Sequence, residues 1–282
     1  MIPDDLKTYD FRQNLIVDAD NPILIQKAWR DRFSGESFWE NWKKKGGGGG
    51  KAYLGQLNSE DAMTWNVFRS LQLAGKQGLD VISDCFGLST VEHVLLWGCD
   101  VQDHSDTQQL LNILIRRIDG RFKGTMTEPD LVLVTANEVV FVECKLNQNG
   151  KGSPWKAQKA SGEQPTGAER RLSVYIEEEG FDELRQIQNW EPLYQIIRQY
   201  VYSKKMAKGL DKSPAVIPLI NGLHAEILEP IYAQILKSPV NNQRVFRGIV
   251  TWQRILAGVE SSSLPIKDNL AEQMRKALEA AR

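Results

Sequence analysis

Apolar and polar positions along the chain change spacing from segment to segment. Between residues 60 and 75 an apolar residue recurs every fourth position, at Met63, Val67 and Leu71. This spacing places the three side chains on one stripe of a helix, and Ser59 before it is a good N-cap. The pattern predicts a helix over about 60–75 with Glu60 on the same stripe.

The rest of the chain continues this alternation of helices and strands. The helix near residue 192 begins at a proline, a residue favoured at the first helical position, and carries the apolar stripe Leu193, Ile196, Ile197, Tyr200 and Val201. In chain order the patterns predict a strand at 93–98, a helix at 105–119, a hairpin at 128–146, the helix near 192, a strand at 215–220, a further strand candidate at 245–252 and a helix at 269–282.

The hairpin EPDLVLVTANEVVFVECKL interrupts two apolar runs with charge. A symmetric turn in TANE pairs residues whose numbers sum to 273, so Asp130 lies directly opposite Glu143. Side chains two apart on a strand share a face, which sets Lys145 beside Glu143 at roughly 7 Å. All three ionisable side chains are therefore predicted to point the same way.

Composition limits the class of protein. The chain has 282 residues, 41% hydrophobic and 25% charged, with a net charge of -1, so it can bury a full core, and any basic surface must be local. Three widely spaced cysteines favour neither a disulfide framework nor a zinc knuckle. The acidic, polar start and the lack of a long apolar run predict a cytoplasmic protein with no membrane span.

We interpret residues 1–282 as one α/β domain. Its core is expected at about 58–222, preceded by an aromatic extension (1–57) that ends in the flexible glycine run 46–50. A helical extension is expected at 223–282. The unperiodic segment 147–171 is predicted to be a long loop.

The paired carboxylates suggest metal chemistry. Two carboxylates opposite each other on a strand pair repel, and buried charge is costly unless it is paired or binds a metal. Asp130 and Glu143 supply hard oxygen ligands that suit Mg2+, with Mn2+ as a substitute. The open alternative is a surface ion cluster on an exposed hairpin, which contributes little.

Asp130 in EPD, followed by Glu143 and Lys145 in ECK, resembles the PD-(D/E)xK nuclease superfamily. The resemblance implies a restriction endonuclease-like core, with a central mixed β-sheet flanked by helices in the order helix, three strands, helix, strand. It also implies Mg2+-dependent hydrolysis of DNA, in which Asp130 and Glu143 bind metal and Lys145 assists the attacking water. Many members add an acid from the first core helix, and Glu60 matches that position as a further metal ligand.

Further contacts are expected around this site. Recombination exonucleases of the superfamily place a Gln and a Tyr four residues apart on the second core helix. This chain has Gln195, Gln199 and Tyr200 there, but the spacing does not match, and an ordinary solvated helix face is the alternative. Basic residues interleaved with an aromatic suit phosphate contact and stacking, although a solvated loop is equally compatible. These candidate DNA contacts are Lys151, Trp155, Lys156, Lys159, Arg170 and Arg171, together with Arg121 and Lys123.

Other chemistry is less well supported by the sequence. His93, His104 and His224 are scattered and are interpreted as structural, and Cys144 faces the opposite side of its strand as a packed core thiol. The sequence therefore predicts a DNA endonuclease of restriction or defence type. A repair, recombination or RNA-cutting nuclease and an idle nucleic-acid-binding module are the alternatives, and a homodimer is compatible with the resemblance.

Overall fold

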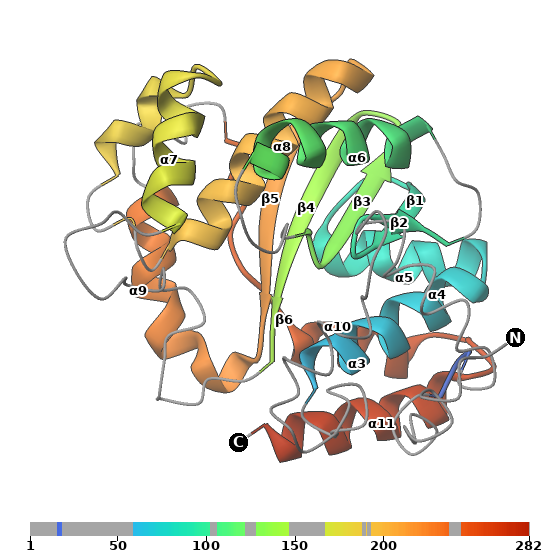
Figure 1. Ribbon diagram of the computed structural model, residues 1–282. Coiled ribbons are helices and arrows are strands. Elements are labelled where there is room, and N and C mark those ends of the chain that lie inside the picture. The colour runs from blue at the N-terminus through green and yellow to red at the C-terminus, as the bar shows by residue number, and fades with distance from the viewer. Residues whose placement is uncertain are drawn as a thin grey trace, which may run out of the picture.

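A computed structural model of the chain describes residues 16–18, 59–101, 106–121, 128–146, 167–187, 190, 193–236 and 244–281. Figure 1 labels its elements. The strands are β1 (Val91–Leu96), β2 (Cys99–Asp100), β3 (Leu131–Thr135), β4 (Glu138–Lys145), β5 (Ser213–Ile220) and β6 (Val250–Thr251). The α-helices are α3 (Glu60–Thr64), α4 (Ser70–Leu73), α5 (Lys76–Phe86), α6 (Asp106–Ile118), α7 (Gly167–Glu177), α8 (Tyr194–Leu210), α9 (Ala225–Leu236), α10 (Trp252–Ser261) and α11 (Lys267–Ala280). Four shorter helical segments are η4 (Trp65–Arg69), η5 (Asp119–Arg121), η6 (Asp182–Gln186) and η8 (Gly222–His224).

The six strands form one mixed sheet in the order β2-β1-β3-β4-β5-β6. The pairs β1–β2, β1–β3 and β3–β4 are antiparallel, whereas β4–β5 and β5–β6 are parallel. This mixed α/β architecture confirms the predicted fold class. The order helix, three strands, helix, strand is present as α3–α5, then β1, β3 and β4, then α7–α8 and β5, with β2 and α6 inserted between β1 and β3. The apolar run VVFV is continuous because β4 lies inside the sheet and is buried on both faces.

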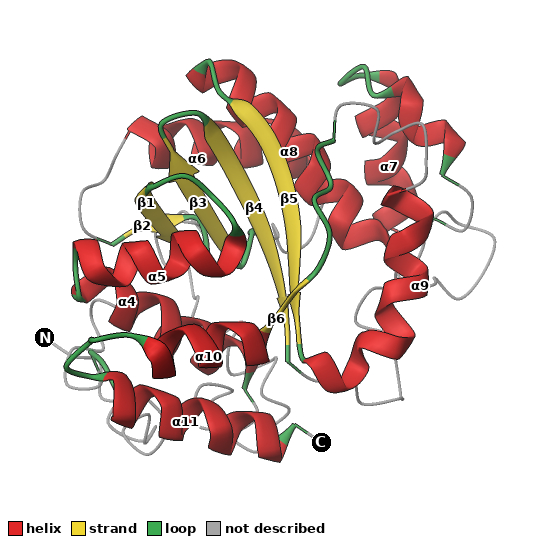
Figure 2. Cartoon of the chain, turned by 180° about the vertical axis from the view of Figure 1, so that it is seen from behind, coloured by secondary structure: helices red, strands yellow, loops and turns green. Residues whose placement is uncertain are grey.

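Helices cover both faces of the sheet, as Figures 1 and 2 show. On one face, α3–α4, α5, α10 and α11 pack around a core that includes Trp65, Val142 and Trp252. On the other, α6, α7, α8 and α9 pack around Phe141, Ile197 and Val216. The C-terminal helices α10 and α11 thus contribute side chains directly to the first core. No helix among the described residues is both long and apolar enough to span a membrane.

Two sequence interpretations need correction. Residues 167–171 belong to helix α7 and not to a loop. In the candidate strand 245–252 only Val250–Thr251 forms a strand, although Phe246 makes an isolated bridge to Val216. The reason is that β6 joins the sheet edge only beside Leu219 and Ile220, after which helix α10 begins.

The helix predicted over about 60–75 is present, but it is not a regular α-helix along its whole length. The Ser59 side chain caps it by accepting from the Ala62 backbone N–H. A π-helical turn, η4, then separates α3 from α4. π-helical turns are rare and are frequent at functional sites. This one lies a single turn after Glu60.

Candidate active site

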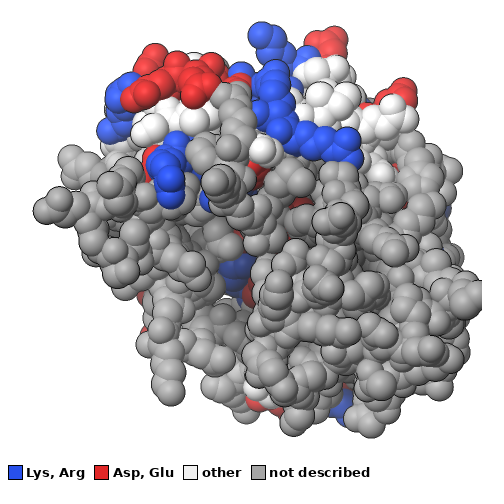
Figure 3. All heavy atoms as spheres, in the orientation of Figure 1, with Lys and Arg blue, Asp and Glu red and all other residues white. Residues whose placement is uncertain are grey.

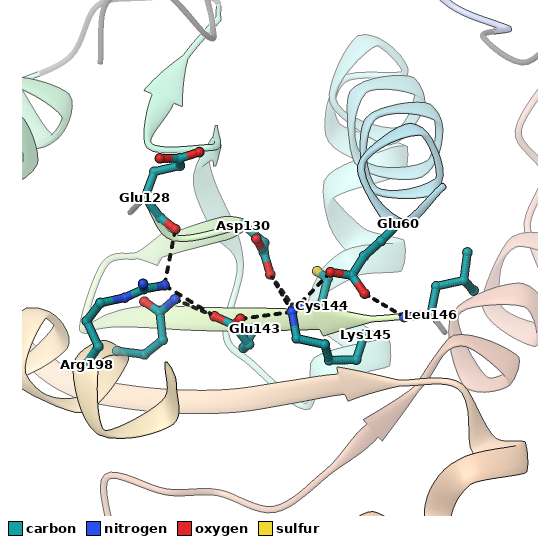
Figure 4. Close-up of polar contacts among 9 residues, drawn as sticks. Glu60, Glu128, Asp130, Glu143, Cys144, Lys145, Leu146 and Arg198 are labelled. Atoms are coloured by element: carbon teal, nitrogen blue, oxygen red, sulfur yellow. Dashed lines mark hydrogen bonds and ion pairs between the residues drawn. The ribbon is translucent and has the colours of Figure 1, made fainter. Parts of the chain in front are cut away.

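The hairpin β3–β4 brings Asp130, Glu143 and Lys145 to one face. Its pairs run from Leu131 with Val142 to Val134 with Val139, the predicted register, and Asp130 directly precedes β3. The Lys145 Nζ lies 3.0 Å from Glu143 Oε1 and 3.9 Å from Asp130 Oδ2. Figure 4 shows these side chains turned toward one another. The predicted register and shared face are confirmed.

Glu60 reaches the same cluster from the opposite layer of the fold. As the first residue of α3, it passes the end of β4, and its Oε1 accepts from Lys145 Nζ at 3.0 Å. Its Oε2 accepts from the Leu146 backbone N–H at 2.9 Å. The structure therefore places Glu60 beside the other three residues, as the resemblance implied, while its part in metal binding stays a prediction.

Helix α8 contributes two further groups on the far side of Glu143. The Gln199 Nε2 donates to Glu143 Oε2 at 2.6 Å, and a guanidinium nitrogen of Arg198 lies 3.9 Å from that oxygen. Gln199 is fully buried, so a solvated helix face is the wrong interpretation for it. Gln195 is half-buried one turn earlier, and its Oε1 accepts no hydrogen bond within the described part of the chain.

Backbone contacts fix Asp130. Its Oδ2 accepts from the Cys144 N–H at 2.8 Å, and its carbonyl accepts from the Trp97 N–H at 3.0 Å. Trp97 has a φ of 50°, an uncommon conformation for a bulky residue. Its ring stacks on Trp65 in the π-helical turn, with centroids 5.2 Å apart. The segments carrying Asp130 and Glu60 are thus joined through two buried tryptophans.

The pKa values of Asp130 and Glu143 are shifted in opposite directions. Burial, and then the neighbouring Glu143, raise the pKa of Asp130 well above its ordinary value of 3.8. Burial also works to raise the pKa of Glu143, but the cations of Lys145 and Arg198 outweigh it and the pKa is lowered. The cluster therefore holds Glu143 ionised while it resists a second charge on Asp130.

The surrounding carboxylates favour the protonated form of Lys145. Burial favours its neutral form, but the carboxylates of Glu143, Glu60 and Asp130 prevail and raise its pKa well above 10.5. In this form its ammonium can donate hydrogen bonds to a negatively charged group.

The carboxylate oxygens of this cluster are of the kind that binds a divalent cation. Three carboxylates face one lysine, so the cluster carries more negative than positive charge, and carboxylate oxygens suit Mg2+ or Mn2+. Within the described ranges, no three His, Cys, Asp or Glu side chains already form a metal-binding group. Lys145 lies among the carboxylates, so the ligand set Asp130, Glu143 and Glu60 stays a prediction.

The Cys144 side chain lies on the other face of β4. It is completely buried in the core beneath α3–α4, and burial raises the pKa of its thiol well above 9.0. A thiol with a raised pKa is a poor nucleophile. The prediction of a packed core thiol is confirmed.

The candidate DNA contacts separate into three groups. Lys123, Lys151, Trp155, Lys156 and Lys159 lie outside the described residues, and for Arg121 only the backbone is described. Arg170 is exposed on α7. Arg171 instead turns inward, where its Nε lies 3.4 Å from Asp119 Oδ1. Their contacts with DNA stay predictions.

Basic and acidic side chains are intermixed at the upper edge of the view in Figure 3. Near α6–α8, Glu179 pairs with both Arg117 and Lys205, and Glu183 pairs with Lys204. These described lysines and arginines therefore do not add up to a uniformly basic surface.

A mixed α/β sheet with Asp130, Glu143 and Lys145 gathered on one hairpin defines the restriction endonuclease-like class of nucleases. The chain belongs to the family described as restriction endonuclease associating with ARP, whose family model matches residues 28–278. The search found no match among curated proteins or solved structures. The family confirms the resemblance seen in the sequence and makes the protein a nuclease of restriction type.

Proposed function

We propose that the protein is a Mg2+-dependent endonuclease that hydrolyses phosphodiester bonds of DNA. The observation that carries the proposal is the cluster of three carboxylates around Lys145, in a chain of a restriction endonuclease family. The excess negative charge of this cluster suits a divalent cation, and a divalent cation in turn attracts a phosphate.

Each residue has a role in this proposal. Asp130 and Glu143 hold the cation, and Glu60 adds a third carboxylate from α3. When bound, Mg2+ or Mn2+ polarises a phosphoryl oxygen and lowers the pKa of a coordinated water. Lys145 in its protonated form donates hydrogen bonds to the negative charge that develops on the phosphate. Gln199 keeps Glu143 in place through its 2.6 Å hydrogen bond.

The test compares the protein with its Asp130→Asn variant on plasmid, long genomic DNA mixtures, single-stranded DNA and RNA, each with Mg2+, Mn2+ or EDTA. Asparagine keeps an oxygen that can accept from the Cys144 N–H but removes the charge. We expect metal-dependent cutting of duplex DNA that falls by more than about a hundredfold in the variant, because outer-shell partners alone contribute 10–100-fold.

Asp182→Asn is the matched control, because Asp182 is 82% exposed on η6. It should cut like the unchanged protein. Cutting that persists in EDTA, or in Asp130→Asn, would contradict the proposal. Preference for RNA or single strands would favour the alternative nucleases, and binding of DNA without any cutting would favour the idle module. The family description names an association with ARP, so an inactive preparation is assayed again with that partner.

A further inference from the structure

Arg198 carries a buried charge to which the proposed hydrolysis assigns no task. It lies on α8 with only 2% of its surface exposed. A buried guanidinium is costly unless charged or polar groups compensate it. Its compensating groups therefore indicate what it does.

One guanidinium spans both segments of the nuclease motif. A terminal nitrogen of Arg198 lies 3.9 Å from Glu143 Oε2 and donates to the Glu128 carbonyl at 3.5 Å. Glu128 precedes Asp130 by two residues, so the contact fixes the backbone that leads into that carboxylate. Figure 4 shows Arg198 facing both segments from α8, across Glu143 from Lys145.

A second buried carboxylate, Asp119, also acts on the charge of Arg198. Burial works to lower the pKa of Arg198, but the carboxylates of Glu143 and Asp119 outweigh it and raise the pKa above its ordinary value. Asp119 is itself fully buried and is held by Arg171 and by the Tyr175 hydroxyl, each at 3.4 Å. Arg198 therefore contacts the active-site carboxylate of Glu143 while its charge is also stabilised by the buried carboxylate of Asp119.

We infer that Arg198 is a positioning residue, which holds Glu143 and the peptide before Asp130 in the arrangement that receives the divalent cation. The inference rests on the proposed function. A guanidinium suits the task because its planar set of five donors can contact two acceptors and still face Asp119, whereas a lysine ammonium is a single point charge on a flexible stem.

The experiment measures Mn2+ binding by calorimetry and the Mg2+ dependence of cleavage in Arg198→Met and Arg198→Lys. Arg198→Met should weaken Mn2+ binding by about 10–100-fold, the usual effect of losing an outer-shell partner. It should raise the half-saturating Mg2+ concentration by a similar factor. Arg198→Lys keeps a charge near Glu143 but cannot also reach the Glu128 carbonyl. Its affinity for Mn2+ should therefore lie between that of the unchanged protein and that of Arg198→Met.

Arg117→Met is the matched control, because it removes a half-exposed guanidinium on neighbouring α6, outside the site, and its partner Glu179 keeps a second cation in Lys205. It should bind Mn2+ like the unchanged protein. If Arg198→Met does not fold, Arg198→Lys alone decides through its affinity. Variants that unfold at lower temperature but bind Mn2+ with unchanged affinity would overturn the inference and leave a purely structural arginine.

The readouts separate this inference from the proposed function. If the unchanged protein binds Mn2+ but cuts no nucleic acid, the proposed function fails, and the binding data still judge Arg198. If it cuts with Mg2+ and the Arg198 variants bind and cut normally, only the inference fails. If it binds no divalent cation, both fail.

Discussion

Two buried polar clusters lie against the same face of the sheet, and their charge balance is opposite. In the active-site cluster, three carboxylates face Lys145. In the second, the single carboxylate of Asp119 faces the guanidiniums of Arg171 and Arg198. With its three carboxylates ionised, the first stays negative even when Arg198, 3.9 Å from Glu143, is counted with Lys145, whereas the second has more positive than negative charge when Arg198 is counted with Asp119. The comparison separates a site that is able to bind metal from a cluster that holds the fold together.

The two clusters also differ in how far their carboxylates are exposed to solvent. Asp130 and Glu60 keep 21% and 27% of their side chains exposed, whereas Asp119 is fully buried. A cation and its water can therefore approach only the first cluster. Arg198 joins the two clusters, which is why the structural one can influence the other.

The largest effect on this comparison is expected from Lys145→Met. It removes the lysine from three carboxylates, one of which, Glu143, is 1% exposed, and should destabilise the fold by about 3–5 kcal/mol, as when one partner of a buried pair is lost. Because a cation can replace the lost charge, added Mn2+ should restore more stability in this variant than it adds to the unchanged protein. Thermal unfolding with and without Mn2+ measures both effects.

Arg171→Met is the counterpart from the second cluster. Its loss should also destabilise the protein, but Mn2+ should not restore the stability, because Asp119 is a single enclosed carboxylate. Mn2+ could restore stability equally in Lys145→Met and Arg171→Met, or in neither. Either result would show that the two clusters do not differ in their affinity for cations.

A smaller effect is expected from the pH dependence of Asp130→Asn. The raised pKa means that folded protein holds the Asp130 proton more tightly than unfolded protein, so stability falls as pH rises from 3.8 through the raised pKa. Asparagine removes this loss. The variant should therefore be more stable than the unchanged protein at neutral pH, and the difference should shrink toward pH 3.

Urea unfolding at several pH values measures this difference. The partial exposure of Asp130 keeps the effect below that of Lys145→Met, since solvent screens the charge. The stability of Asp130→Asn is compared with that of the unchanged protein at each pH. If the advantage of the variant were smaller at neutral pH than at pH 3, the raised pKa of Asp130 would be contradicted.

The smallest effect is expected from Arg117→Met, outside both clusters. Arg117 is 51% exposed, and its partner Glu179, although only 6% exposed, also pairs with Lys205 at 2.9 Å. Because Glu179 keeps this second cation, the loss of Arg117 should change the free energy of unfolding by an amount near that of an exposed ion pair, about 0–1 kcal/mol. A larger loss, seen by the same urea unfolding, would mean that the surface pairs along α6–α8 contribute more to stability than the comparison assumes.

The sequence was most informative where structure is local. Asp130, Glu143 and Lys145 could be placed together because a tight hairpin fixes its own register and side chains alternate with a period of two. Cys144 was assigned to the other face by the same rule. The motif and the order of elements were then enough to predict the fold class.

Prediction was weaker where segments distant in sequence meet. Arg198 is not part of the apolar stripe predicted for its helix, although Val201 and Tyr202, one turn later, are apolar neighbours that could have signalled burial. The helix α7 was missed because GAERRLSVYIE begins with residues that also suit a loop. The π-helical turn left no signal that differs from an ordinary helical pattern.

The sequence by itself determined the hairpin, its register and the face that bears the charged motif, because these depend on neighbours along the chain and on the pleat of a strand. Only the tertiary structure decided that Glu60 passes the end of β4 to Lys145, and that Gln199 and Arg198 contact Glu143 from α8. Those contacts depend on how helices from both layers pack on the sheet, which no local spacing fixes.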